Sequence, residues 1–395
     1  MHVLTVLPFL CSFVLAQPPR MLPLASRIEH LDRGGREPMV VEHPKGVLFV
    51  STYGEPRPVL WKSSDRGATW NRVNVGEEAD GAIGNSDVDL AVAADGTLYF
   101  VNLFFNRESR QGTHISIGVS RDVGVSWKWT VLSKAPFVDR PWVAVSASGA
   151  AHVVWSDDAG VHHSVSRDRG VTWSEPARLA ALGQSSHIAS GPGKEIAVRL
   201  TPLYAAGAKA APGVDRLVIS TDDGETWHDR PAPGERDWKS PRTAQPHWVE
   251  PVAWDSMGAL YSFWTTNDGL WLARSSDRGE TWATSLVAKS DDPAYYPYLI
   301  ARGRGELAVS WFSGHGETLR FHVARLEVVA GKPPRIVASD PIQLDTWNRT
   351  DPTQRDTAGE YVGLTFLRSG GIGVAAPIFN PREGRHGITW LRFAN

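Results

Sequence analysis

One eight-residue phrase occurs five times in the chain, and no other feature constrains the fold as strongly. The copies read SSDRGATW (63–70), SRDVGVSW (120–127), SRDRGVTW (166–173), STDDGETW (220–227) and SSDRGETW (275–282). Their shared aspartates lie 57, 46, 54 and 55 residues apart. Repeats of this length are typical of propellers and solenoids, in which one small unit recurs many times.

Short runs of β character surround each copy of the phrase. The clearest unit covers residues 139–179 and contains PWVAVSAS, GAAHVVWS, VHHSVSRD and TWSEPARL. These runs are rich in β-branched residues and are broken by Gly, Asp and Ser, which is typical of strands joined by tight turns. Four antiparallel strands repeated radially form a β-propeller, which leaves only short, protected edges. We therefore predict an all-β fold, a single closed β-propeller with essentially no helix.

The number of blades follows from the number of strand sets. The predicted first strands begin near seven residues, namely Glu37, Asp87, Asp139, His187, Glu250, Tyr295 and Glu360. The last two units keep their strands but lack the phrase, and the seventh stops after its third strand. Residues 24–31, LASRIEHL, are predicted to supply the missing fourth strand and close the ring. The predicted propeller thus has seven four-stranded blades, with six as the alternative.

The repeated phrase has a local structural role. An aspartate in a hairpin turn accepts backbone N–H bonds two residues on, and the glycine supplies a left-handed backbone conformation. The tryptophan starts the fourth strand, and its ring is expected to be largely buried between the turn and an adjoining sheet. The five conserved-register aspartates are therefore interpreted as turn-stabilising residues and not as catalytic acids.

The N-terminus resembles a secretory leader. Residues 3–16, VLTVLPFLCSFVLA, form an apolar run too short to span a bilayer comfortably. We predict a signal peptide at 1–16, cleaved after Ala16, a propeller domain at 17–395, and a secreted or periplasmic protein. The single cysteine, Cys11, lies inside the leader, so no disulfide is expected.

Composition narrows the possible partners. The formal net charge is −2 at pH 7, which argues against nucleic acid or an anionic membrane surface as a partner. Histidine and aspartate are scattered without metal-ligand spacing, and no phosphate-cradling glycine loop follows a strand. We expect no cofactor and no resident metal, and we expect a monomer whose partner is a carbohydrate.

The Ser-x-Asp-x-Gly-x-Thr-Trp phrase resembles the Asp box, or BNR repeat, of sialidases and related propellers. The five copies extend this resemblance over nearly all of the chain after residue 16. The resemblance implies a glycoside hydrolase of the exo-α-sialidase type, which releases a terminal acidic sugar. In that family a glutamate base activates a tyrosine nucleophile, and arginines bind the substrate carboxylate.

Individual residues match positions of that family's site. Arg36, in GREP, stands where an arginine binds the sugar carboxylate, and Arg320, in ETLRFHVARL, matches another such arginine. Glu250, in HWVEPVAWDSMGALYSFW, matches the base, and Tyr361, in EYVGLTFLRSGGIGVAA, matches the nucleophile. The family's acid/base aspartate in the first blade is missing, and Glu55 in TYGEPRP is its nearest substitute.

Two further departures separate the chain from the family. The strand ALYSFWTTN after Glu250 lacks the arginine that the family carries there. The family fold has six blades, whereas the strand count here is seven. The resemblance therefore favours a glycan-active propeller and leaves the reaction open.

Strand order assigns the loops to two faces. Turns between first and second strands share one face with the Asp boxes, and the first strands begin on the opposite face, which we call the axial mouth. Propellers commonly bind ligands at this place. The candidate substrate-binding residues predicted there, besides the arginines above, are Asp87, Asp139, Arg140, His187, His247 and Tyr296.

Three interpretations of the axial mouth compete. In the first, arginines clamp an acidic sugar, and Tyr361 with Glu250 forms the nucleophile pair of a sialidase. In the second, His187 or His247 with a tyrosine abstracts the C5 proton of a uronic acid, as in a polysaccharide lyase. In the third, the polar ring belongs to a non-catalytic binding propeller. Segments 206–213 and 231–246 are predicted to be loops over the mouth, either lids or simple insertions.

Overall fold

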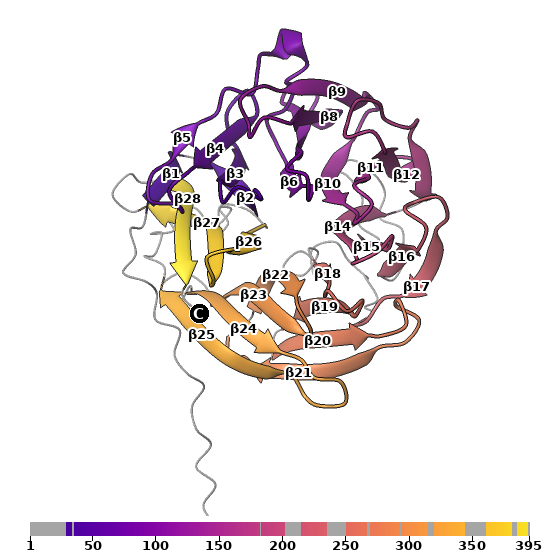
Figure 1. The fold of residues 1–395 in the computed structure, drawn as a ribbon, viewed down its shortest axis with the longest axis vertical. Helices are drawn as coiled ribbons and strands as arrows, with labels where there is room; N and C mark the ends of the chain where they lie inside the picture. Colours follow the sequence, from indigo (N-terminus) through magenta and orange to yellow (C-terminus); the bar gives the residue numbers. More distant parts are fainter. Residues whose placement is uncertain are drawn as a thin grey trace, which may run out of the picture.

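The structure, a computed structural model, describes residues 29–33, 35–181, 183–201, 215–234, 250–266, 269–292, 294–314, 320–343, 361–380 and 385–393. Seven small antiparallel sheets of four strands each stand in a ring around one axis (Figure 1). Within these residues one short 3-10 helix, η1 (Glu78–Asp80), accompanies the strands. The predicted all-β propeller with seven blades is confirmed.

The blades are numbered here in chain order. Blade 1 consists of β2 (Arg36–Glu42), β3 (Leu48–Tyr53), β4 (Val59–Ser63) and β5 (Asn71–Arg72). Blade 2 consists of β6 (Val88–Val92), β7 (Leu98–Asn106), β8 (Gln111–Ser120) and β9 (Lys128–Ser133). Blade 3 consists of β10 (Asp139–Val145), β11 (Ala151–Asp157), β12 (Gly160–Ser166) and β13 (Ala177–Ala180). Blade 4 consists of β14 (Gln184–Ser190), β15 (Ile196–Thr201), β16 (Arg216–Ser220) and β17 (His228–Pro231). Blade 5 consists of β18 (Val252–Trp254), β19 (Leu260–Thr265), β20 (Gly269–Ser275) and β21 (Ala283–Lys289). Blade 6 consists of β22 (Ala294–Arg302), β23 (Glu306–Ser313), β24 (Arg320–Glu327) and β25 (Arg335–Gln343).

Blade 7 joins the two ends of the described chain. It consists of β26 (Gly363–Phe366), β27 (Ile372–Asn380), β28 (Arg385–Phe393) and β1 (Glu29–Arg33). β1 pairs antiparallel with β28, with Glu29 opposite Trp390, so the N-terminal strand closes the ring as predicted. The strand covers residues 29–33, and the rest of the predicted 24–31 segment lies outside the described residues.

The Asp-box aspartates accept backbone N–H groups of their turn as predicted, although the donors lie three and four residues on and not two. Asp168 Oδ1 accepts the backbone N–H groups of Val171 (3.1 Å) and Thr172 (2.9 Å), and Oδ2 accepts the Thr172 hydroxyl (2.6 Å). Ser166 Oγ donates to the Asp168 carboxylate and accepts the N–H of Gly170. The Thr172 hydrogen bonds lower the pKa of Asp168 to about 2. The four other copies repeat this pattern.

Each Asp box packs on the preceding blade. At Gly170 (φ +74°) an added Cβ would come within 2.6 Å of Val119 on blade 2. Trp173 meets Tyr99 of the same blade edge-on, with ring centroids 6.4 Å apart. The five Asp-box tryptophans are each partly buried and pack against an apolar cluster of the core, in agreement with the expectation that their rings are largely covered. They stand at the outer rim, where one side of the ring covers the neighbouring blade and the other meets solvent.

Contacts between loops confirm how the faces are divided. Arg169, in an Asp box, pairs with Asp95 in the turn between β6 and β7 (2.7 Å). Asp223, in the next Asp box, accepts the hydroxyl of Ser148 in the turn between β10 and β11. First-to-second turns therefore lie with the Asp boxes, and the starts of the innermost strands lie on the opposite face, the axial mouth.

Candidate functional site

The innermost strands of blades 1, 3 and 6 start with the same backbone distortion. Glu37, Arg140 and Tyr296 have φ angles of 46°, 51° and 50°, a left-handed region that residues other than glycine rarely adopt. Each is followed by a proline and sits where the pairing register slips. All three side chains are buried. Bulges re-aim side chains, and strain of this kind concentrates at functional sites.

An aromatic cluster lies next to these bulges. Trp142, Tyr298, His187 and Tyr361 come from blades 3, 6, 4 and 7, and all are less than 9% exposed. The Trp142 ring lies edge-on to Tyr361 (4.9 Å between centroids) and to His187 (5.2 Å). The His187 ring lies edge-on to Tyr298 at 5.4 Å. Four blades therefore meet through one group of rings, which we call the axial cluster.

The hydrogen bonds of His187 define its protonation. Its Nδ1 accepts the backbone N–H of Val252 (3.4 Å), so the proton lies on Nε2 and is donated to the Tyr298 hydroxyl (3.2 Å). Burial lowers the pKa of His187 to about 4, which keeps the imidazole neutral. Burial and nearby Asp89 raise the pKa of Tyr298 well above its ordinary value. At neutral pH both groups of this pair are therefore uncharged.

Two carboxyl groups of blade 2 are made weakly acidic. Burial raises the pKa of Asp89 to about 7, against two backbone N–H bonds, from Val143 (2.9 Å) and Leu90 (2.8 Å). Burial also raises the pKa of half-buried Asp87, and the positive charge of Arg140 opposes this rise. A carboxyl group with a raised pKa can donate a proton at neutral pH.

Glu250 belongs to a buried ionic cluster. Arg199 Nη2, from β15, donates to Glu250 Oε2 at 2.5 Å and to Asp215 Oδ2 at 2.9 Å. None of the three side chains is exposed to solvent. The arginine that pairs with Glu250 comes from the second strand of the preceding blade, and sequence reasoning did not single it out. A lone arginine inside the apolar run IAVRLT was the available signal.

The other predicted site residues are dispersed. Arg36 and Arg320 are exposed. Asp139 is half-buried, and its Oδ2 accepts the side-chain amide of Gln184 at 3.0 Å. His247, the leader at 1–16, the segment 206–213 and most of 231–246 lie outside the described residues.

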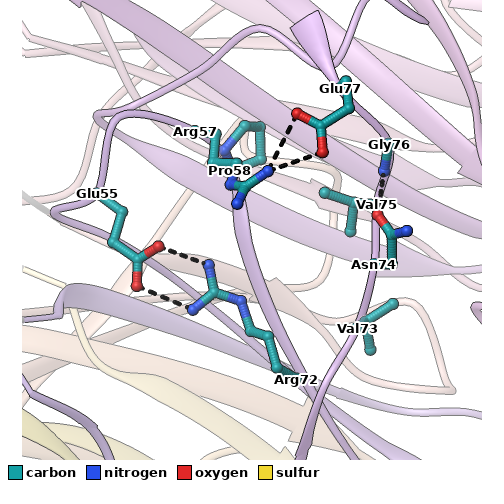
Figure 2. Close-up of a pocket in the computed structure, with 9 residues that line it drawn as sticks. All are labelled: Glu55, Arg57, Pro58, Arg72, Val73, Asn74, Val75, Gly76 and Glu77. Atoms are coloured by element: carbon teal, nitrogen blue, oxygen red, sulfur yellow. Dashed lines mark hydrogen bonds and ion pairs between the residues drawn. The ribbon is translucent and has the colours of Figure 1, made fainter.

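Glu55 lies in a separate pocket on blade 1 (Figure 2). Arg72 Nη1 and Nη2 donate to its two carboxylate oxygens at 3.0 and 2.9 Å. These bonds lower the pKa of Glu55 and keep it ionised. A second ion pair, Arg57 with Glu77, crosses the same pocket. Glu55 is thus grouped with three other charged residues and not with the axial cluster.

No group of three or more His, Cys, Asp or Glu side chains among the described residues could hold a metal ion. Among the same residues, no helix is long and apolar enough to cross a membrane.

Neither protein-family models nor curated protein sequences match the chain. Solved structures resemble it in fold. A Dyadobacter fermentans protein of unknown function has a TM-score of 0.52 and 16% identity over 96% of this chain and 98% of its own. A polysaccharide lyase described as an ulvan lyase has a TM-score of 0.54 and 12% identity over 95% and 96%. A Hadza microbial sialidase has a TM-score of 0.51 and 16% identity over 88% and 76%. Identities this low show a common propeller fold and nothing finer.

Proposed function

We propose that the protein is a secreted, glycan-active enzyme that binds an acidic sugar at the axial mouth and releases it by hydrolysis, in the manner of an exo-α-sialidase. The observation that carries this proposal is the bulge at Arg140. Its guanidinium is buried, its backbone is strained, and its charge acts on Asp87. A buried guanidinium is well suited to bind a sugar carboxylate through two parallel hydrogen bonds.

The remaining roles follow from the environment of each group. Asp87, half-buried and with a raised pKa, donates the proton to the leaving-group oxygen. Tyr361 attacks the anomeric carbon, and Glu250 removes its phenolic proton. Arg199 bonds Oε2 of Glu250 and stabilises the ionised form that a base requires. Atoms balance: the tyrosine oxygen forms a bond to carbon, the glycosidic bond breaks, and water later releases the sugar.

A polysaccharide lyase is the second candidate, because the axial cluster contains a hydrogen-bonded His187–Tyr298 pair. A lyase would need one member to take the C5 proton of a uronic acid. Here Nδ1 of His187 already accepts a backbone N–H, and the raised pKa of Tyr298 keeps its phenol protonated. Neither member of the pair is therefore a ready base for the C5 proton at neutral pH, which ranks the lyase second.

Two substrates separate the candidates. A sialoside with a chromogenic leaving group reports hydrolysis, and a uronate polymer reports elimination through the ultraviolet absorbance of its unsaturated product. We expect sialoside hydrolysis by the native protein and a loss of about 10³-fold or more in Tyr361→Phe at unchanged thermal midpoint. Tyr261→Phe, which removes a buried hydroxyl on the Asp-box face, is the matched control and should keep its activity.

The alternative outcomes are equally distinct. Unsaturated product alone, abolished by His187→Asn, would establish the lyase in place of the hydrolase. Turnover of neither substrate, with binding of both lost in Arg140→Gln, would make the protein a binding propeller.

A further inference from the structure

The pocket on blade 1 has one apolar wall. The pocket encloses about 400 Å³ between the loop from β3 to β4 and the segment after β5. Val75 is buried and Val73 is half-buried along this wall, and buried Pro58 lies beside Arg57. The carbonyl of Val75 accepts the indole N–H of Trp129 from blade 2 at 2.7 Å, which holds the wall in place. Figure 2 shows the three apolar residues with Asn74 between the two valines.

Two ion pairs cross the pocket, each joining the β3–β4 loop to the segment of residues 72–77 (Figure 2). Glu55 pairs with Arg72 through both oxygens, and Arg57 Nη1 alone bonds both oxygens of Glu77, at 2.9 and 3.1 Å. The Nε and Nη2 donors of Arg57 are therefore not used by Glu77. Arg72 also lies over the Trp61 ring, 5.5 Å from its centroid. Ion pairs as exposed as these contribute little to stability, so their alignment around a hollow calls for another explanation.

The pocket is suited to a neutral, polyhydroxylated ring. Two positive and two negative side chains line it, so their charges cancel and favour neither an anion nor a cation. Carboxylates accept and guanidiniums donate hydrogen bonds, and adjacent sugar hydroxyls can do both. The apolar wall can pack against the C–H face of a pyranose. We propose that this pocket binds a neutral pyranose unit.

The pocket and the axial mouth lie on the same face of blade 1. Arg36, at the start of β2, pairs across the sheet with Tyr53, the last residue of β3, and Glu55 follows two residues later. A glycan with its acidic unit at the mouth could thus extend outward along this blade. The continuity of one glycan through both places rests on the proposed function, whereas binding of the pyranose at blade 1 does not.

Binding can be measured without any reaction. Saturation-transfer NMR and titration would use three methyl pyranosides, of galactose, glucose and mannose, with glucuronate as the charged comparison. We expect millimolar binding of at least one neutral pyranoside, and weaker binding of glucuronate by Arg140→Gln, in which the proposed acidic-sugar site is removed. Glu55→Gln and Glu77→Gln should each weaken that binding about tenfold, because each keeps the side-chain shape but removes an acceptor and breaks an ion pair.

A matched control isolates the pocket from a general charge effect. Glu306→Gln breaks a similar two-pronged pair, with Arg302 at 2.8 and 2.8 Å, on the Asp-box face. Binding should be unchanged in this variant and in Arg140→Gln. Thermal midpoints establish that each variant is folded, and the two glutamine variants of the pocket test the proposal independently.

Three results would overturn the proposal: no binding of any neutral pyranoside, binding of that pyranoside undiminished in both Glu55→Gln and Glu77→Gln, or, in Arg140→Gln, tighter binding of glucuronate than of the neutral sugars. The two proposals fail separately. A protein that binds pyranosides at blade 1 but hydrolyses no sialoside retains the pocket and loses the proposed function. A protein that hydrolyses sialosides but binds no neutral pyranoside retains the proposed function and loses the pocket proposal.

Discussion

Aspartates on the two faces of the propeller have pKa values that are shifted in opposite directions. On the Asp-box face the same turn occurs five times, and each aspartate is satisfied within its own turn, with a pKa near 2 in every copy. At the axial mouth the side chains at equivalent positions differ, as Glu37, Arg140 and Tyr296 do in the shared bulge of blades 1, 3 and 6. There the pKa values of Asp87 and Asp89 are raised, and Arg140 sits in a strained bulge.

This difference separates residues that build the fold from residues that could act. An aspartate whose carboxylate is already hydrogen-bonded within its own turn has little capacity to bind a substrate or react with it. A buried group whose ionisation is disfavoured, or a backbone strained at equivalent places in three blades, is retained against a cost in free energy. Residues that are repeated in the five Asp boxes therefore stabilise the fold, whereas residues that differ from blade to blade at the axial mouth form the candidate site.

The largest effect on the free energy of unfolding is expected on the axial-mouth side, in the buried ionic cluster that contains Glu250. Arg199→Met leaves Asp215 and Glu250 buried without their cation, and breaking a buried pair in this way costs about 3–5 kcal/mol. The free energy of unfolding in urea measures this loss. Arg335→Met, which breaks an exposed pair with Glu327, is the control and should cost less than about 1 kcal/mol. Equal losses in the two variants would contradict the role given to Arg199.

A smaller, pH-dependent effect is expected on the Asp-box face, where blades 3 and 4 meet. His152 Nδ1 and His163 Nε2 are 3.0 Å apart, and His152 Nε2 lies 3.3 Å from Asp223. Burial lowers the pKa of His152 to about 4 and of His163 to about 3. An unfolded histidine titrates near 6.5, so the unfolded chain takes up protons first as the pH falls. Their stabilising contribution is complete above about pH 6.5 and is lost as the pH falls from there to about 4 for His152 and about 3 for His163.

A variant isolates this contribution from those of other groups. Between pH 7.5 and 5 the native protein should lose roughly 2 kcal/mol more unfolding free energy than His163→Gln, which lacks one of the two titrating rings. Asp89, with its raised pKa, has the opposite pH dependence, but it is common to both proteins and cancels. His228→Gln, at an exposed position, should follow the native curve. Parallel curves for the native protein and His163→Gln would refute the assignment.

Sequence reasoning succeeded for this molecule wherever a role was repeated. The register of the five phrases identified the turns, the blades and the closing strand, because each of these depends on local geometry or on the count. Trp142 and Tyr298 were not singled out, because the axial cluster joins residues of four blades and no local pattern says which of them meet.

The smallest effect tests the comparison most directly, since it concerns one aspartate from each face. Asp168→Ala should lower the thermal midpoint by only about 2–4 °C and leave sialoside turnover intact, because the carboxylate serves its own exposed turn. The folded-state pKa of Asp168 is lowered to about 2, so its stabilising effect is present above about pH 4 and disappears as the pH falls toward 2. The gap in midpoint between the native protein and Asp168→Ala should therefore narrow in acid. Asp87→Asn should behave in the opposite way, with turnover lost and the midpoint unchanged or raised, because burial disfavours its charged form. Loss of turnover in Asp168→Ala at an unchanged midpoint would show that the repeated face, and not the irregular one, contains the chemistry.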